Sequence, residues 1–177
     1  MARLIALFGA AVLAACSAQQ GGDQAAAPDG RVRDLAGILD PAVEARLTER
    51  LDEAERLYGP QVGIVTVTSL DGRSIEDFAT DYANEWGLGD RDRDDGLIIV
   101  VAPNDRKVRI GTGLGIERTY PDAWAQQVID RTLLPQFRQQ NYGRGLEGAV
   151  DMIVARIKQH PTLPANDNAP SQVREAA

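Results

Sequence analysis

Two short apolar segments separated by an amphipathic helix pattern constrain the fold of this chain most strongly. Residues 62–68 are β-branched and nearly all apolar, and residues 97–102 are apolar throughout, which is typical of strands covered on both faces. Between them, residues 74–86 carry apolar side chains at three- and four-residue spacing, and Ser74 and Asp77 approximate a capping box. This order predicts a βαβ unit, in which the two strands are parallel.

A helix is also predicted before the first of these strands. Asp40 is suited to cap its start and Pro41 to occupy its first position, while Gly59-Pro60 ends it. Between these signals, apolar residues recur on one face and charged residues on the other. The pattern indicates a helix that packs one face on the core.

The chain after the second strand predicts a hairpin and two more helices. A turn at residues 103–105 leads into residues 106–110, which alternate polar and apolar. Helices are expected near 120–139, with a kink or break at Pro135, and near 142–158. The fold class is therefore α/β, a three-layer α/β/α sandwich around a small mixed β-sheet.

The N-terminus is typical of a bacterial lipoprotein signal peptide. Arg3 precedes an apolar run over residues 4–12 that is too short to span a bilayer. The sequence LAAC at residues 13–16 resembles a lipobox, in which cleavage falls before the cysteine and that cysteine carries the lipid. Cys16 is the only cysteine of the chain, so a disulfide within the chain is excluded. The alternative is a free thiol in an ordinary signal peptide.

These features predict the domain organisation and the location. Residues 1–15 are expected to be the signal peptide, 16–30 the lipidated cysteine and a flexible tether, 31–159 the folded domain and 160–177 a disordered tail. Several acyl chains anchor a protein stably. We therefore expect a protein of the bacterial cell envelope that is lipid-anchored and faces the periplasm. Ser17, rather than Asp, follows the cysteine, which in such lipoproteins points to the outer membrane.

A glycine-hinged acidic loop lies directly before the second strand. It holds four carboxylates within six residues: Asp90, Asp92, Asp94 and Asp95. Their mutual repulsion at neutral pH would be offset by a bound divalent cation, although such loops are often only solvated surface. The loop is not an EF-hand, because Gly96 comes one position late and Val101, at position 12, has no side-chain oxygen.

Charge and residue types limit the possible chemistry. A net charge of -7 argues against nucleic acid as a partner, because phosphate binding relies on clustered Lys and Arg. His160 lies in the predicted tail and Cys16 is expected to carry lipid. The predicted domain therefore has no histidine or cysteine for a Ser-His-Asp or Cys-His mechanism. Ligands restricted to oxygen favour calcium or magnesium over zinc.

A glycine-rich turn over residues 111–117 follows the hairpin. It lacks the spacing of a dinucleotide fingerprint or a P-loop, so a flexible strand-to-helix turn is favoured over a phosphate cradle. Glu117 and Asp122 flank this turn and are candidates to meet Asp94 and Asp95 at one end of the sheet. Asp122 has an alternative role, which is to cap its own helix.

Four segments, taken in order, resemble the TPM domain family over about residues 31–158. These segments are DLAGIL at 34–39, ANEWGLG at 83–89, DGLIIVVAPNDRKVRI at 95–110 and GLGIE at 113–117. Asp34 of the first segment is expected to fix the N-terminal turn. The family pattern at the acidic loop falls on Asp94, Asp95 and Gly96, whereas Asp90 and Asp92 are supported only by the run of charges and are expected to face solvent.

The resemblance implies an α/β/α sandwich and, as in some members, a divalent cation at an acidic cluster beside the sheet. Calcium is the typical ion, and magnesium is possible. Carried over by matching position, the metal ligands implied are Asp94, Asp95, Glu117 and Asp122. Arg118 replaces the final glycine of the last motif, a change that narrows the rim of this site or adds charge to it.

The family does not share one function, so three hypotheses remain open. The first is a membrane-tethered, cation-binding module that assists or stabilises envelope protein complexes. The alternative is a metal-dependent acid phosphatase acting on phosphomonoesters, with Arg106 or Arg109 as an electrostatic clamp on phosphate. In the third, the acidic loop is only solvated and partners bind a rim around Trp86 and Trp124. For Trp86, packing in the core is the competing interpretation.

Overall fold

A computed structural model describes residues 30–163 of the chain. The predicted signal peptide, the predicted lipidation site Cys16, all but the last residue of the predicted tether, and residues 164–177 lie outside the described residues. Its elements are β1 (Val32–Asp34), α1 (Pro41–Tyr58), β2 (Gln61–Thr66), α2 (Ile75–Trp86), β3 (Gly96–Ala102), β4 (Lys107–Thr112), α3 (Asp122–Val128), a π-helical segment (Ile129–Leu133), α4 (Leu134–Phe137) and α5 (Tyr142–Gln159). None of the helices in this described part combines the length and apolar composition that a bilayer-spanning segment needs.

The four strands form one mixed sheet in the order β1-β2-β3-β4. Strands β1, β2 and β3 are parallel, and β4 runs antiparallel to β3. The predicted parallel pair and the predicted hairpin are both confirmed. Strand β1 was not predicted, because three residues are too short to show an alternation of polar and apolar side chains.

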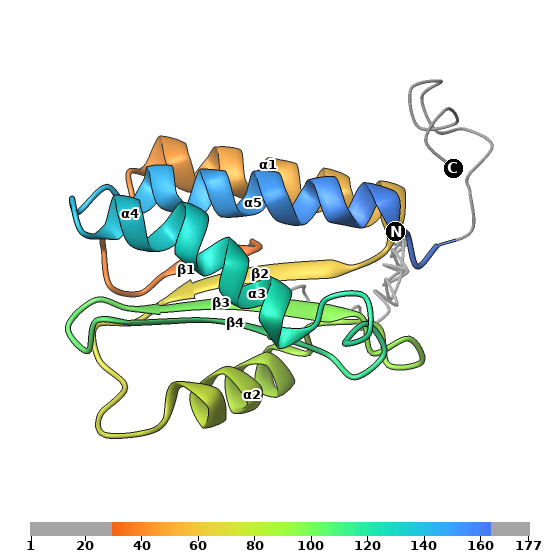
Figure 1. Cartoon of the computed structure of the whole chain (residues 1–177), viewed down its shortest axis with the longest axis horizontal. Coiled ribbons are helices and arrows are strands. Elements are labelled where there is room, and N and C mark those ends of the chain that lie inside the picture. Colours follow the sequence, from red (N-terminus) through yellow and green to blue (C-terminus); the bar gives the residue numbers. More distant parts are fainter. Residues whose placement is uncertain (1–29, 164–177) are drawn as a thin grey trace, which may run out of the picture.

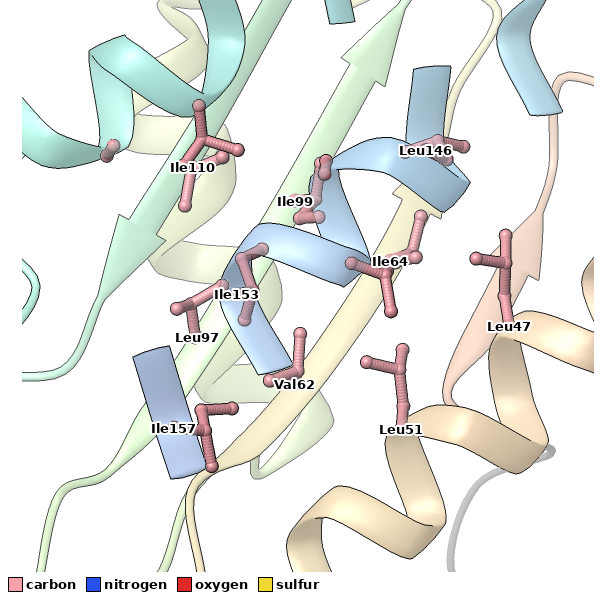
Figure 2. Close-up of a cluster of buried hydrophobic side chains, with 14 of the residues drawn as sticks. Leu47, Leu51, Val62, Ile64, Leu97, Ile99, Ile110, Leu146, Ile153 and Ile157 are labelled. Atoms are coloured by element: carbon pink, nitrogen blue, oxygen red, sulfur yellow. The ribbon is translucent and has the colours of Figure 1, made fainter. Parts of the chain in front are cut away.

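Helices cover both faces of this sheet, as the predicted three-layer sandwich requires. Figure 1 shows α1, α3, α4 and α5 on one face and α2 alone on the other. The larger core lies under the four helices. Side chains from both sides of that interface are labelled in Figure 2: Leu47 and Leu51 of α1, Val62 and Ile64 of β2, Leu97 and Ile99 of β3, Ile110 of β4, and Leu146, Ile153 and Ile157 of α5.

Local capping chemistry explains where the first two helices begin. The Asp40 side chain accepts a hydrogen bond from the Ala42 amide at 2.7 Å, and the Ser74 hydroxyl accepts one from the Asp77 amide at 3.0 Å. Each bond satisfies an amide that has no partner inside its helix. Gly59, with φ of 106°, ends α1 as predicted.

The helix predicted near 120–139 is divided into three pieces. α3 ends at Val128, the π-helical segment covers residues 129–133, and α4 begins at Leu134. Pro135 lies in the first turn of α4. Because proline has no amide hydrogen and its ring crowds the preceding turn, the regular helical bonding is interrupted just before it.

Candidate functional site

A cavity of about 450 Å³ lies between α2 and the strands β3 and β4. Three of the four predicted metal ligands line it, namely Asp94, Glu117 and Asp122. Asn84 of α2 and Arg109 of β4 line it as well. All three carboxylate residues are exposed to solvent, and Arg109 is the one cationic residue beside them in the lining that residues 30–163 form.

The glycine-rich turn holds Asp94 in place. Asp94 has a φ of 47°, and its Oδ2 accepts a hydrogen bond from the Leu114 amide at 2.9 Å. A Cβ atom on Gly113 would lie 2.3 Å from the Asp94 carbonyl oxygen, and one on Gly115 would lie 1.8 Å from that of Arg93. The two glycines therefore allow the turn to pack directly on the acidic loop.

Asp122 does not cap α3. The helix begins at Asp122, and Pro121 occupies the N-cap position without a side-chain hydrogen bond. The capping alternative is therefore wrong, because Asp122 lies inside the first turn rather than before it. Its Oδ1 lies 3.7 Å from Arg109 Nη2, and Arg109 Nη1 lies 3.5 Å from Glu76 Oε1. Arg109 thus links α2 and α3 through pairs that are partly exposed and individually weak.

Asp95, the fourth predicted ligand, does not line the cavity, although its neighbours Asp94 and Gly96 do. Its side chain is 0 % exposed. Oδ1 accepts a hydrogen bond from the Asp90 amide at 3.0 Å, and Oδ2 accepts bonds from Arg93 Nε at 2.8 Å and Thr162 Oγ1 at 2.7 Å. Burial raises the pKa of this carboxyl, but the bonds from Thr162, Arg93 and the Asp90 amide lower it more, so the net pKa falls below its ordinary value.

Asp90 and Asp92 have different roles in the loop. Asp92 is exposed, as predicted. Asp90 Oδ1 instead accepts hydrogen bonds from the Asp92 amide at 3.0 Å and the Arg93 amide at 3.1 Å. Asp90 is therefore only partly exposed, because its carboxylate also closes a turn of the Asx type.

Asp34 fixes the turn after β1, as expected. Its Oδ1 accepts a hydrogen bond from the Ile38 amide at 3.2 Å, and its Oδ2 accepts one from the Leu39 amide at 2.8 Å. The Thr66 hydroxyl also donates to Asp34. The carboxylate therefore ties this turn to the neighbouring strand β2.

The two arginines predicted to contact phosphate lie in different cavities. Arg109 lines the acidic cavity, whereas Arg106 lies in the β3–β4 turn and lines a cavity near α4. They are three positions apart in the sequence, but β4 starts between them, at Lys107, and places Arg109 farther along the sheet. They cannot clamp one phosphate together.

Neither tryptophan is fully exposed to solvent. Trp86 is 8 % exposed, which confirms core packing, and the Arg33 guanidinium lies 4.2 Å from its ring centroid. Trp124 is half-buried, with its ring 5.3 Å from Tyr120 and 4.9 Å from the Arg156 guanidinium. Neither forms the open aromatic rim of the third hypothesis.

The donor atoms of the cavity match a hard cation in kind. Carboxylate and amide oxygens are the ligands that calcium prefers. Within residues 30–163, however, no group of three or more His, Cys, Asp or Glu side chains is already placed around a common ion position. Asn84 was missed by sequence reasoning, although it lies within the ANEWGLG segment at the end of α2. A cation would therefore have to draw these side chains together.

Comparisons with known proteins agree with this fold. The TPM domain family matches residues 32–156. The chain is similar to the N-terminal domain of a protein from P. gingivalis, with 31 % identity, 75 % of this chain and 87 % of that chain covered, and a TM-score of 0.67. No match was found among curated proteins.

Two more distant solution structures share the fold. The N-terminal domain of the cg2496 protein from Corynebacterium glutamicum has 15 % identity and a TM-score of 0.59, with 81 % of this chain and 85 % of that chain covered. The BA42 protein from Bizionia argentinensis has 19 % identity and a TM-score of 0.61, with 75 % and 91 % covered. These two structures share the fold alone. The family match over residues 32–156, together with the 31 % identical relative, shows that the chain belongs to the TPM domain family.

Proposed function

We propose that this TPM domain is a divalent-cation-binding module, with calcium as its preferred ion. It would act as a lipid-anchored periplasmic protein that assists or stabilises envelope protein complexes. The observation that carries the cation proposal is the shared cavity of Asp94, Glu117 and Asp122, lined also by Asn84. These four side chains would hold the ion.

The charge balance of the cavity supports this proposal. Within residues 30–163, neither Asp94 nor Glu117 forms an ion pair, and Arg109 is shared between Asp122 and Glu76. The site therefore carries an excess of negative charge, which a divalent cation would neutralise. Calcium tolerates flexible coordination and bound water, whereas magnesium demands near-octahedral geometry. An open site whose ligands are not preassembled favours calcium.

Asp95 is not part of the proposed ligand set. Both of its oxygens already accept hydrogen bonds from protein donors, and the side chain has no exposed surface. Moving it to an ion would break the hydrogen bonds from Arg93, Thr162 and the Asp90 amide that satisfy this buried carboxylate. We assign Asp95 to the structure of the loop.

Calorimetric titration with calcium tests the cation proposal. The mature chain, produced from residue 17 without lipid, is expected to bind calcium, and Asp94→Asn and Glu117→Gln are each expected to weaken binding at least about tenfold. Asp92→Asn is the matched control, because Asp92 is acidic and exposed but lies outside the cavity. Absence of heat at millimolar calcium, or equal binding by Glu117→Gln, would contradict the proposal.

The lipid anchor on Cys16 is tested separately. Cells expressing the full chain with a clickable palmitate analogue are expected to label the protein and retain it in the membrane fraction. Cys16→Ser should abolish the label and release the protein, and Ser17→Asp should keep the label but shift the protein toward the inner membrane. Labelling of Cys16→Ser would refute the anchor.

Envelope partners are sought by crosslinking in intact cells. The lipidated wild-type protein and the Glu117→Gln variant are compared after purification of crosslinked complexes. A partner that is retained by the wild type and lost from the variant would support a cation-dependent assembly role. Identical partner sets would argue that the cavity has no part in assembly.

A phosphatase remains the second candidate function because Arg109 lines the same cavity as the carboxylates. A bound cation would supply electrostatic activation of a phosphoryl oxygen, and the Arg109 guanidinium would hold phosphate. Hydrolysis of an aryl phosphate that is lost in both Arg109→Gln and Glu117→Gln would favour this candidate. Activity that persists in both variants would indicate a contaminating enzyme.

A further inference from the structure

A second cavity lies at the opposite end of the sheet, where β3 ends and the chain turns into β4. Its volume is about 650 Å³. Figure 1 shows the β3–β4 turn and α4 at one end of the molecule, whereas β3 begins at the other end. The two cavities also lie on opposite faces of the sheet, because residues of α2 line the first and residues of α4 line the second. Ligands of open α/β sheets commonly bind at this end, beyond the carboxyl ends of parallel strands.

The lining of this cavity is cationic, unlike the acidic protein around it. Arg106, Lys107 and Arg138 line it and are exposed. In the part of the chain from 30 to 163, none of the three forms an ion pair. The carboxylate next in sequence, Asp105, accepts a hydrogen bond from the Leu70 amide at 2.9 Å and does not line the cavity. The cavity therefore presents positive charge that the described protein leaves uncompensated.

An apolar wall faces the same space. Leu134 and Phe137 of α4 and Tyr142 at the start of α5 line the cavity and are only partly buried. The rings of Phe137 and Tyr142 pack together with their centroids 5.0 Å apart. The cavity thus combines a cationic side with an aromatic side.

We propose that this second cavity binds an acidic peptide segment that carries an aromatic or aliphatic anchor residue. Guanidinium groups match carboxylates with paired hydrogen bonds, and the apolar wall would bury the anchor. An inorganic anion would contact only the cationic side chains and would leave Phe137 and Tyr142 exposed to water. In an extended segment, residues two apart share a face, which suits an apolar anchor flanked by carboxylates.

The position of β4 adds to this argument. Among residues 30–163, β4 is the last strand of the sheet, with β3 as its only strand neighbour. Lys107, the first residue of β4, lines the cavity. A bound extended segment would therefore lie next to the outer edge of a strand, where backbone groups are available for pairing. This proposal is independent of calcium binding at the other end of the sheet.

Fluorescence anisotropy with labelled peptides tests the proposal. The mature chain is expected to bind the peptide EDFDEL at low salt, and to bind the neutral QNFNQL and the anchorless EDSDES at least about tenfold more weakly. The double variant Arg106→Gln with Arg138→Gln should lose about tenfold or more in affinity for EDFDEL. Arg91→Gln with Arg118→Gln is the matched control, because both arginines are exposed but lie outside this cavity.

Three results would overturn the proposal. The first is equal binding of QNFNQL or EDSDES, which would show that charge or anchor plays no part. The second is unchanged binding of EDFDEL by the Arg106→Gln/Arg138→Gln variant. The third is binding of inorganic phosphate or phosphatidylglycerol vesicles that requires Arg106 and Arg138 in the absence of any peptide binding.

Discussion

Thr162 donates a hydrogen bond of 2.7 Å from Oγ1 to Oδ2 of Asp95, a fully buried carboxylate 67 positions earlier in the chain. The amides of Thr162 and Leu163 also donate to the Tyr58 carbonyl at 2.8 and 3.1 Å. The segment after α5 is thereby joined to the acidic loop and to the end of α1. The described domain consequently extends to Leu163, beyond the predicted boundary at residue 159, and Asp95 is committed to holding it together.

Replacing Thr162 is expected to destabilise the domain. Thr162→Val keeps the shape of the side chain but removes a hydrogen bond to a charged group, which lowers the free energy of unfolding by about 1.5–3 kcal/mol. Thr68→Val, at an exposed threonine, is the matched control. Urea unfolding measures both variants, and a change below about 0.5 kcal/mol in Thr162→Val would contradict the assigned role.

Acid is expected to remove the contribution of Asp95. The pKa of this carboxyl in the folded protein is lowered from its ordinary value of 3.8, so ionised Asp95 stabilises the fold above that value. The stabilisation is lost as the pH falls through the lower folded-state pKa. Urea unfolding of wild type and Asp95→Asn between pH 7 and 2 should show a stability difference that shrinks below pH 3.8. A difference that stays constant over this range would rule the effect out.

The close contact between the glycine-rich turn and the acidic loop predicts that a side chain at Gly115 destabilises the protein, whereas one at Gly148, away from this contact, does not. Gly115→Ala places a methyl group 1.8 Å from the Arg93 carbonyl oxygen, and the forced separation should cost about 1–3 kcal/mol or more. Gly148 lies within α5, where an added Cβ would meet Thr132 at an ordinary 3.4 Å. Gly148→Ala should therefore be neutral or stabilising by up to about 1 kcal/mol. Thermal unfolding distinguishes the two, and equal stabilities would refute the contact.

Removing the Tyr120 hydroxyl is expected to stabilise the protein. This hydroxyl is buried and has no hydrogen-bond partner within residues 30–163, and burial raises the pKa of Tyr120 to about 12. Tyr120→Phe removes an unsatisfied polar group and should raise the free energy of unfolding by about 1 kcal/mol. Tyr142→Phe, at a partly exposed tyrosine, should change it by less than about 0.5 kcal/mol. Destabilisation by Tyr120→Phe in urea unfolding would mean that the hydroxyl has a partner in solution.

The elements of the fold could be predicted wherever they depend on nearby residues. Capping at Asp40 and Ser74 and the apolar periodicity of the helices and strands act within a few positions, so the βαβ unit, the hairpin and the sandwich could be inferred. Strand β1 escaped prediction because its three residues are a strand only through pairing with β2, some 30 positions later.

Only the tertiary structure decided which of the predicted residues line the candidate site. Asp94 and Asp95 are adjacent and equally acidic in the sequence, yet Asp94 lines the cavity while Asp95 is buried against Arg93 and Thr162. Thr162, which donates to Asp95, comes near this carboxylate only when α5 packs on the sheet. The sequence by itself therefore determined the family and most of the secondary structure, because those follow from motif order and local spacing. Which carboxylates remain open to a ligand depended on contacts between distant segments.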